Sequence, residues 1–197
     1  LRPRLSVPRA LLVFFLCSRR QPYSLCFASS APQDVDRRHT TGGWVTSNSK
    51  RSNARMISER LLVDRAAAAR FLAFHVPNQD PEDVIADVEA MIAPELPISV
   101  LLLGMGADMH TASLFPGVLG LEKALEPSAT PLAILRPDSQ PEARISLSAR
   151  VLDAAISKHL VIFGDEKRKA LEKALLLPPE QAPIQAVLSE TTVHWAP

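Results

Sequence analysis

The chain has 197 residues, of which 47% are apolar and 22% are charged. That length is sufficient for one domain with a well-buried core. The net charge of +1 gives no overall argument for binding nucleic acid. The apolar run ALLVFFLC has only eight residues, far too few to span a bilayer, so no membrane segment is expected.

The N-terminal segment differs from the rest of the chain in charge. Residues 1–57 hold ten of the 22 basic residues but only two of the 21 acidic ones, which leaves the remainder with a net charge of −7. Both cysteines, Cys17 and Cys26, lie in this segment at a spacing that is not a metal-binding motif, and no glycine precedes Gly42. Arginines before ALLVFFLC and the later ASSA follow the order of a leader peptide, but SRRQ interrupts that pattern. A leader and a shifted reading frame both stay open as explanations.

Alternating helices and strands are predicted from about residue 45 onward. Residues 52–62 and 66–74 have helical propensity. A longer helix is predicted with Asp80 as its N-cap and Pro81 in its first turn. Apolar residues recur on one face of this helix, at Val84, Ile85, Val88 and Ile92.

A strand buried on both faces is predicted in PISVLLLGMG, residues 97–106, because this is a continuous apolar run that ends in glycine. A helix is predicted from Asp165 onward. Further strands are predicted at residues 131–136, 143–149, 159–164 and 192–197. Helices that alternate with apolar strands are typical of an α/β domain, so we predict a Rossmann-like, mainly parallel sheet flanked by helices.

The segment GMGADMHTASLFPG, residues 104–117, directly follows the predicted buried strand. Ligands of parallel sheets bind beyond the carboxyl ends of the strands. Gly104 and Gly106 would let the backbone approach a ligand closely, and His110 is able to exchange a proton near neutral pH. From spacing alone, catalysis and simple packing against the sheet explain His110 equally well.

The whole segment resembles the 6-phosphogluconolactonase signature G-x-G-x-D-G-H-T-A-S-L-F-P-G, with Met109 in place of one glycine. The resemblance continues through RISLS (144–148), IFGDEKRKALEKAL (162–175) and the closing PIQAVLS and VHWAP, and it begins at WV (44–45), followed by SN (52–53). We therefore expect residues 44–197 to form a partial α/β domain of this family. Residues 1–43 would be a non-matching basic arm, disordered or aberrant.

The resemblance implies hydrolysis of 6-phospho-D-glucono-1,5-lactone to 6-phosphogluconate in the oxidative pentose phosphate pathway. A lactone carbonyl is already electrophilic, so neither a metal nor an organic cofactor is expected. Phosphorylated sugars stay inside cells, which implies a cytoplasmic protein whose partner is the small phosphosugar lactone. The oligomeric state is left open.

The resemblance also implies roles for particular residues. His110 would be the general base, with Asp108 either orienting it or holding the loop. Backbone amides at Gly104 and Gly106 would stabilise the oxyanion. Arg144 and Lys167 would bind the phosphate, although ordinary surface charge explains both as well.

Two departures from the family pattern lie near the N-terminus. The family has a Gly-Gly-Ser/Thr phosphate loop after its first strand, whereas this chain has no glycine before Gly42. The family's D-E-R before the tryptophan is replaced by Thr41, Gly42 and Gly43. We therefore expect the sheet to lack at least one N-terminal strand and lactone hydrolysis to be impaired.

Two other functions are considered. Glucosamine-6-phosphate deaminases also carry G-x-D-G-H, but there I-A-F-N-E follows, where this chain has TASLF. A non-catalytic remnant that binds phosphosugar weakly is the other alternative. A dehydrogenase is poorly supported, because GMGADM lacks the third glycine of the dinucleotide-binding motif.

Overall fold

The computed structural model describes residues 11–14, 37–40, 42–138 and 141–197. In these ranges, six parallel strands form the main sheet in the order β4-β2-β1-β5-β8-β9. Its strands are β1 (Leu11–Phe14), β2 (Arg37–Thr40), β4 (Arg70–Leu72), β5 (Val100–Leu103), β8 (Ser157–Phe163) and β9 (Thr191–Ala196). A smaller antiparallel sheet, in the order β3-β7-β6, consists of β3 (Gly42–Gly43), β7 (Arg144–Leu147) and β6 (Leu132–Leu135).

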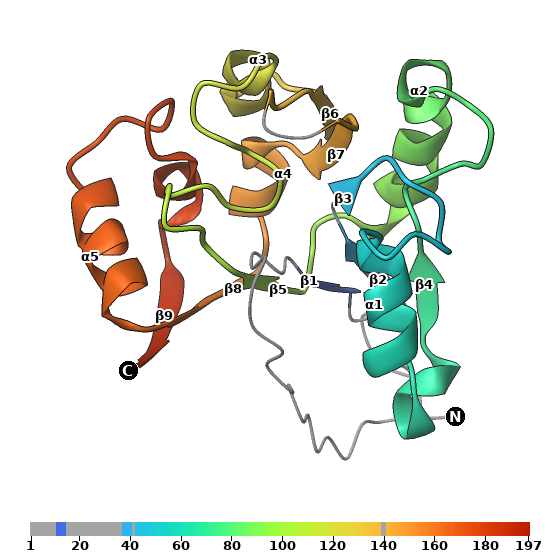
Figure 1. Cartoon of the computed structure of the whole chain (residues 1–197), viewed down its shortest axis with the longest axis horizontal. Helices are drawn as coiled ribbons and strands as arrows, with labels where there is room; N and C mark the ends of the chain where they lie inside the picture. Colours follow the sequence, from blue (N-terminus) through green and yellow to red (C-terminus); the bar gives the residue numbers. More distant parts are fainter. Residues whose placement is uncertain (1–10, 15–36, 41, 139–140) are drawn as a thin grey trace, which may run out of the picture.

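Helices connect these strands and cover the main sheet. The α-helices are α1 (Asn53–Arg60), α2 (Pro81–Ile92), α3 (Leu121–Leu125), α4 (Ala149–Asp153) and α5 (Asp165–Ala174). Short 3-10 helices are η1 (Asp64–Ala68), η2 (Ala93–Glu95) and η3 (Pro183–Val187). Figure 1 shows the main sheet across the middle of the molecule, with α2, α3 and α4 above it. The predicted α/β fold with a mainly parallel sheet flanked by helices is confirmed.

The expectation that the sheet lacks its N-terminal strands is wrong. In the register of the sheet, residues 12–14 of β1 pair with residues 100–102 of β5, and β2 lies between β1 and β4. The apolar LLVF of β1 has the composition of a strand inside a parallel sheet. The family resemblance begins only at Trp44, so it gave no sign of these strands. The division at residue 43 stays a prediction, and both cysteines lie outside the described residues.

Residues 66–74 are not the helix that their alanines predict. η1 ends at Ala68, and β4 then pairs in parallel with β2. Leu72 and Phe74 are both 5% exposed, while Ala73 between them is exposed. This two-residue alternation is the strand signal that the helical propensity of alanine obscured.

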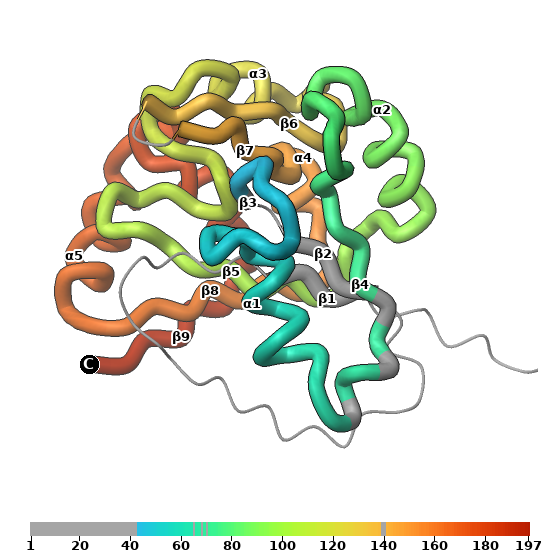
Figure 2. The backbone as a smooth tube through the Cα atoms, turned by 45° about the vertical axis from the view of Figure 1, so that its right-hand side comes forward, coloured from blue at the N-terminus to red at the C-terminus, as the bar shows by residue number. Residues whose placement is uncertain are grey.

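The predicted strands at 131–136 and 143–149 exist as β6 and β7, but they pair antiparallel in the smaller sheet. The connection between them, residues 136–143, is too short for the crossover of about a dozen residues that parallel pairing requires. Figure 2 shows β7 and β3 together above the main sheet.

Helix α2 begins at Pro81 as predicted, and its residues Val84, Val88 and Ile92 are buried. Asp80 is the N-cap residue, although its side chain makes no capping hydrogen bond. Glu89 Oε1 accepts a hydrogen bond from the Leu132 amide at 2.9 Å, which joins α2 to the edge of β6.

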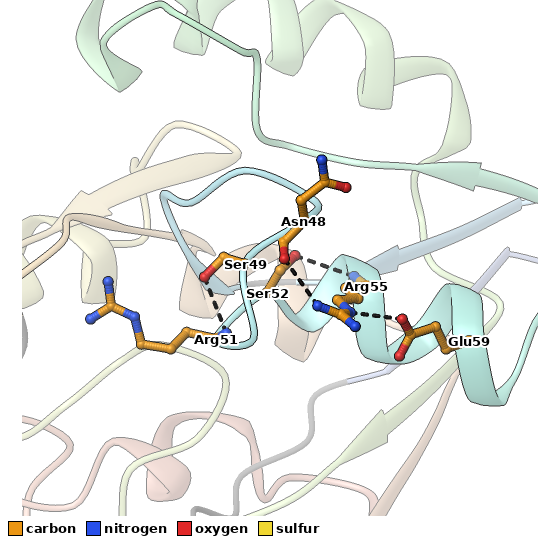
Figure 3. A network of polar contacts seen from close by, with 6 residues as sticks. All are labelled: Asn48, Ser49, Arg51, Ser52, Arg55 and Glu59. Atoms are coloured by element: carbon orange, nitrogen blue, oxygen red, sulfur yellow. Dashed lines mark hydrogen bonds and ion pairs between the residues drawn. The ribbon is translucent and has the colours of Figure 1, made fainter.

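Side-chain hydrogen bonds fix the start of α1 (Figure 3). Ser52 is the N-cap, and its hydroxyl accepts a hydrogen bond from the Arg55 amide at 3.2 Å. The Arg55 guanidinium donates to the Asn48 carbonyl at 3.0 Å and to Glu59 at 2.7 Å. These contacts hold the turn that follows Trp44 against the first two turns of the helix.

The two faces of β8 differ in burial. Along β8, Leu160 and Ile162 are buried in one cluster with residues of α4, α5 and η3. Ser157, His159 and Val161 alternate with these residues and are only partly buried. None of the helices in the described ranges combines the length and apolar character needed to cross a membrane.

Candidate active site

The loop after β5, residues 104–120, lies at the carboxyl edge of the parallel sheet, where ligands bind in folds of this type. Two hydrogen bonds close its first half into a compact turn. Thr111 Oγ1 donates to the Gly104 carbonyl at 2.9 Å, and the Gly106 amide donates to the His110 carbonyl at 3.0 Å. The backbone that carries His110 is therefore held in place by the loop itself.

Asp108 and His110 are in direct contact. Asp108 Oδ1 lies 2.5 Å from Nδ1 of His110, and the His110 amide donates to the same oxygen at 3.3 Å. The His110 side chain is 15% exposed and that of Asp108 is 54% exposed. When the carboxylate accepts the Nδ1 hydrogen, a neutral imidazole carries its lone pair on Nε2. This tautomer makes Nε2 the atom of His110 that can accept a proton.

Two opposing effects act on the pKa of Asp108. Partial burial would raise the pKa of this carboxyl, but the hydrogen bond from His110, the charge of that ring and backbone hydrogen bonds outweigh it, and the pKa lies below its ordinary value. Asp108 is therefore ionised at neutral pH and available as an acceptor for Nδ1–H.

Gly106 is required by the Asp108–His110 pair. A Cβ atom at residue 106 would lie 2.2 Å from Asp108 Oδ1 and 2.4 Å from His110 Nδ1, far inside contact distance. The close approach at Gly106 is thus to these two side chains, whereas the sequence interpretation placed a ligand there. At Gly104, the carbonyl accepts the Thr111 hydroxyl; oxyanion stabilisation by Gly104 and Gly106 stays a prediction.

Met109 has the backbone conformation that its family counterpart, glycine, adopts easily. Its φ is +65°, in the left-handed region, which costs a residue with a side chain roughly 1–2 kcal/mol. The Met109 carbonyl accepts a hydrogen bond from the Ile184 amide at 3.1 Å, so η3 supports this conformation from outside the loop.

Arg144 reaches the same loop from β7. Its Nε donates to Ser113 Oγ at 3.0 Å, and its guanidinium carbon lies 5.4 Å from the centre of the Phe115 ring. Phe115 also contacts His110, with ring centres 4.2 Å apart and planes inclined by 34°. Phe115 therefore stands between the predicted base and a predicted phosphate-binding arginine.

Sequence reasoning did not single out Phe115 or Ser146. Ser146, in β7, is fully buried, and its Oγ accepts a hydrogen bond from the Ser113 amide at 3.3 Å. This bond docks the loop onto β7 and so determines where Arg144 reaches it. Phe115 could have been found from its place inside the family signature, but Ser146 carries no local signal because its partner lies 33 residues away.

Lys167 lies in the first turn of α5, which follows β8 directly and so begins at the same edge of the sheet as the His110 loop. Its side chain is partly buried. This position agrees with the predicted substrate edge, and phosphate binding by Lys167 stays a prediction.

An open depression of about 500 Å³ adjoins Asp108 and Phe115. Its basic side chain is Arg136, just after β6, which sequence reasoning also missed and which pairs with Glu82. The other residues that line it are Pro116, Gly117, Val118, Leu119, Pro137 and Asp138. The depression has the size of a small-molecule site.

Residues 39–195 match the family described as glucosamine-6-phosphate isomerases/6-phosphogluconolactonase. The chain belongs to this family. The match begins within β2, five residues before the resemblance seen in the sequence at Trp44.

Individual relatives are similar over most of the chain. The 6-phosphogluconolactonase of Pseudomonas aeruginosa is 39% identical over 159 residues, which are 78% of this chain and 66% of that protein. That of Mesorhizobium japonicum is 37% identical over 162 residues, 78% of this chain and 67% of that protein. The crystal structure of a 6-phosphogluconolactonase from Shewanella baltica superposes with a TM-score of 0.83 at 28% identity, covering 94% of this chain and 82% of that one.

The chain thus spans about two thirds of the length of these curated relatives. The family predicted from the signature is confirmed. The signature lies inside the matched region, and its histidine and aspartate form the contact on which a hydrolytic role depends.

Proposed function

We propose that this chain hydrolyses 6-phospho-D-glucono-1,5-lactone to 6-phosphogluconate. The observation that carries the proposal is the contact between Asp108 and Nδ1 of His110 at the carboxyl edge of the sheet, next to Arg144. Relatives named 6-phosphogluconolactonase, up to 39% identical, support the choice of substrate. The substrate in turn implies a cytoplasmic location.

His110 acts as the general base. Its Nε2 removes a proton from a water molecule while the water oxygen attacks the lactone carbonyl carbon, and Asp108 stabilises the imidazolium that forms. The tetrahedral intermediate then collapses, the bond from the carbonyl carbon to the ring oxygen breaks, and the imidazolium returns the proton to that oxygen. General base catalysis of this kind contributes about 10²–10⁴-fold to a rate.

Arg144 and Lys167 bind the substrate phosphate in this proposal. The hydrogen bond to Ser113 and the Phe115 ring hold the Arg144 guanidinium at the loop, where a planar fork of donors suits a phosphate.

We further propose that turnover is slow. The main sheet contains β1 and β2, so a missing strand is not the reason. The reason is chemical: the connection from β1 to β2 contains no glycine with which to enclose a phosphate, and Gly43 replaces the arginine of the family's D-E-R. In the register of the smaller sheet Gly43 is opposite Arg144, so the site has lost a cation beside one it retains.

A product assay tests the substrate and reaction. The purified chain is incubated in strong neutral buffer with the phospholactone, the spontaneous rate is subtracted, and 6-phosphogluconate is measured. A second reaction with glucosamine 6-phosphate is monitored for ammonia. We expect 6-phosphogluconate and no ammonia. Ammonia release, or binding of 6-phosphogluconate with no rate above the spontaneous one, would contradict the proposal in favour of a deaminase or a binding protein.

A further inference from the structure

Two histidines outside the proposed active site lie together on the main sheet. His159 is in β8 and His194 is in β9, and the register places His194 opposite Val161, two residues after His159. The two are therefore diagonal neighbours on one face of the sheet. This is the face on which β8 carries its partly exposed residues, while Leu160 points into the core.

The two rings already meet through their nitrogen atoms. Nδ1 of His159 and Nε2 of His194 are 3.0 Å apart, and the ring centres are 5.3 Å apart with planes inclined by 33°. Ser157 Oγ lies 3.0 Å from the other nitrogen of His159, Nε2. When Nε2–H donates to this hydroxyl, the lone pair of His159 is on Nδ1, the nitrogen that faces His194.

This arrangement resembles part of a metal coordination sphere. If an ion lay about 2.1 Å from both nitrogens, the usual metal–imidazole distance, the nitrogen–metal–nitrogen angle would be about 90°. Neighbouring ligands in octahedral and square-planar sites have this angle. The separation of 3.0 Å therefore brings the two nitrogens close enough to bind one ion. Ni²⁺ and Cu²⁺ stand high in the affinity order of divalent first-row ions for nitrogen ligands.

Neighbouring positive charges are directed away from this face. Lys158 alternates with His159, is buried on the opposite side and pairs with Asp153. Arg168 lies 5.0 Å from the ring of Trp195, the residue after His194, and so also belongs to the opposite side. A divalent cation at the histidine pair would not face either of them.

We propose that His159 and His194 form a surface site for a divalent transition-metal ion of the Ni²⁺ or Cu²⁺ type. The two imidazoles supply neighbouring ligands and water completes the coordination sphere. On binding, His194 moves its remaining proton to Nδ1, both rings turn about their Cβ–Cγ bonds to direct their lone pairs at the ion, and Ser157 holds the His159 tautomer. The ion joins β9 to β8, which stabilises the edge of the sheet.

Calorimetric titration with Ni²⁺ tests this site. The chain carries no polyhistidine tag, and Cys17→Ser and Cys26→Ser remove competing thiolates. Ser157→Ala is expected to weaken Ni²⁺ binding about tenfold, the usual size for loss of a hydrogen-bond partner of a metal-bound histidine. His159→Asn and His194→Asn should each weaken it further, whereas the matched control His75→Asn should leave it unchanged. Ni²⁺ should also raise the Tm of the parent, but not of the two asparagine variants.

Equal Ni²⁺ affinity in the parent and in both asparagine variants, or no binding to the parent, would overturn the proposal. If the asparagine variants fail to fold, line broadening by Ni²⁺ in the unmodified chain still tests the site. Paramagnetic Ni²⁺ should broaden the ring-proton signals of His159 and His194 at lower concentration than those of His75 and His110. Broadening of His75 or His110 first would also overturn it.

Discussion

Asp108 Oδ1 lies 2.5 Å from Nδ1 of His110, and the space this contact occupies exists because residue 106 has no side chain. The glycine of the signature is thus tied to the chemistry of the pair two and four residues later. Loss of any one of the three should remove the same function.

Gly106→Ala should abolish lactone hydrolysis almost as completely as loss of His110. The new methyl group would lie 2.2 Å from the Asp108 carboxylate oxygen, so the pair must separate. Steady-state kinetics should show a fall in kcat of about 10²-fold or more, the contribution of a general base. Ala107→Ser, at an exposed neighbouring position, is the matched control and should keep the parent kcat.

Asp108→Asn should lower kcat by at least about tenfold, because an amide no longer enforces the tautomer with its lone pair on Nε2. KM should change little, since Asp108 acts through His110 in this account. A rise in KM at constant kcat would instead identify Asp108 as a substrate-binding residue.

The pKa of Asp108 also predicts a dependence of stability on pH. Because this pKa lies below its ordinary value of about 3.9, the ionised carboxylate stabilises the folded chain at pH values above that. The contribution disappears as the pH falls through the lowered pKa. In urea unfolding, the advantage of the parent over Asp108→Asn should be at its full size near pH 5 and should shrink in more acid solution. An advantage that grows in acid would contradict this sign.

Met109 allows a comparison of two small replacements. Met109→Gly and Met109→Ala both remove a partly buried side chain, but only glycine adopts φ of +65° without strain. The glycine variant should be more stable than the alanine variant by about 1 kcal/mol, measured by thermal or urea unfolding. The reverse order would show that positive φ is not required there.

Arg144→Lys should weaken binding of the phosphorylated lactone while keeping its charge, because lysine lacks the fork that bonds to Ser113 and stacks on Phe115. KM should rise about tenfold for the phospholactone and remain unchanged for unphosphorylated gluconolactone. Arg168→Lys, on α5 beside Trp195, is the control. Equal effects on both lactones would place Arg144 away from the phosphate.

Apolar runs and helix-start residues in the sequence predicted the strands and helices that such short patterns specify. β5 is a continuous apolar run, β8 ends in the apolar residues LVIF, and α2 has a recognisable start at Asp80 and Pro81, so all three were found. β4 was missed because the helical propensity of alanine conceals a short strand whose stability comes from pairing with β2. The strands of the arm were missed because the resemblance seen in the sequence begins only at Trp44.

In the candidate site too, contacts between residues close in sequence could be predicted, whereas contacts between distant residues could not. Asp108 and His110 are two residues apart, so their contact could be anticipated from the signature. The position of Arg144 depends on the docking of the loop onto β7 through Ser113 and Ser146, which sequence spacing does not encode. Arg136 directly follows β6 and lines the depression together with residues of the His110 loop, which are distant from it in the sequence.

The rate of phospholactone hydrolysis by the unmodified chain, compared with its His110→Asn variant, tests the central claim most directly. Both are measured in the same buffer with the spontaneous rate subtracted, and circular dichroism verifies that the variant is folded. We predict slow turnover by the parent that falls by about 10²-fold or more in the variant. Equal rates for the two proteins, whether both above the spontaneous rate or both at it, would contradict His110-dependent lactone hydrolysis.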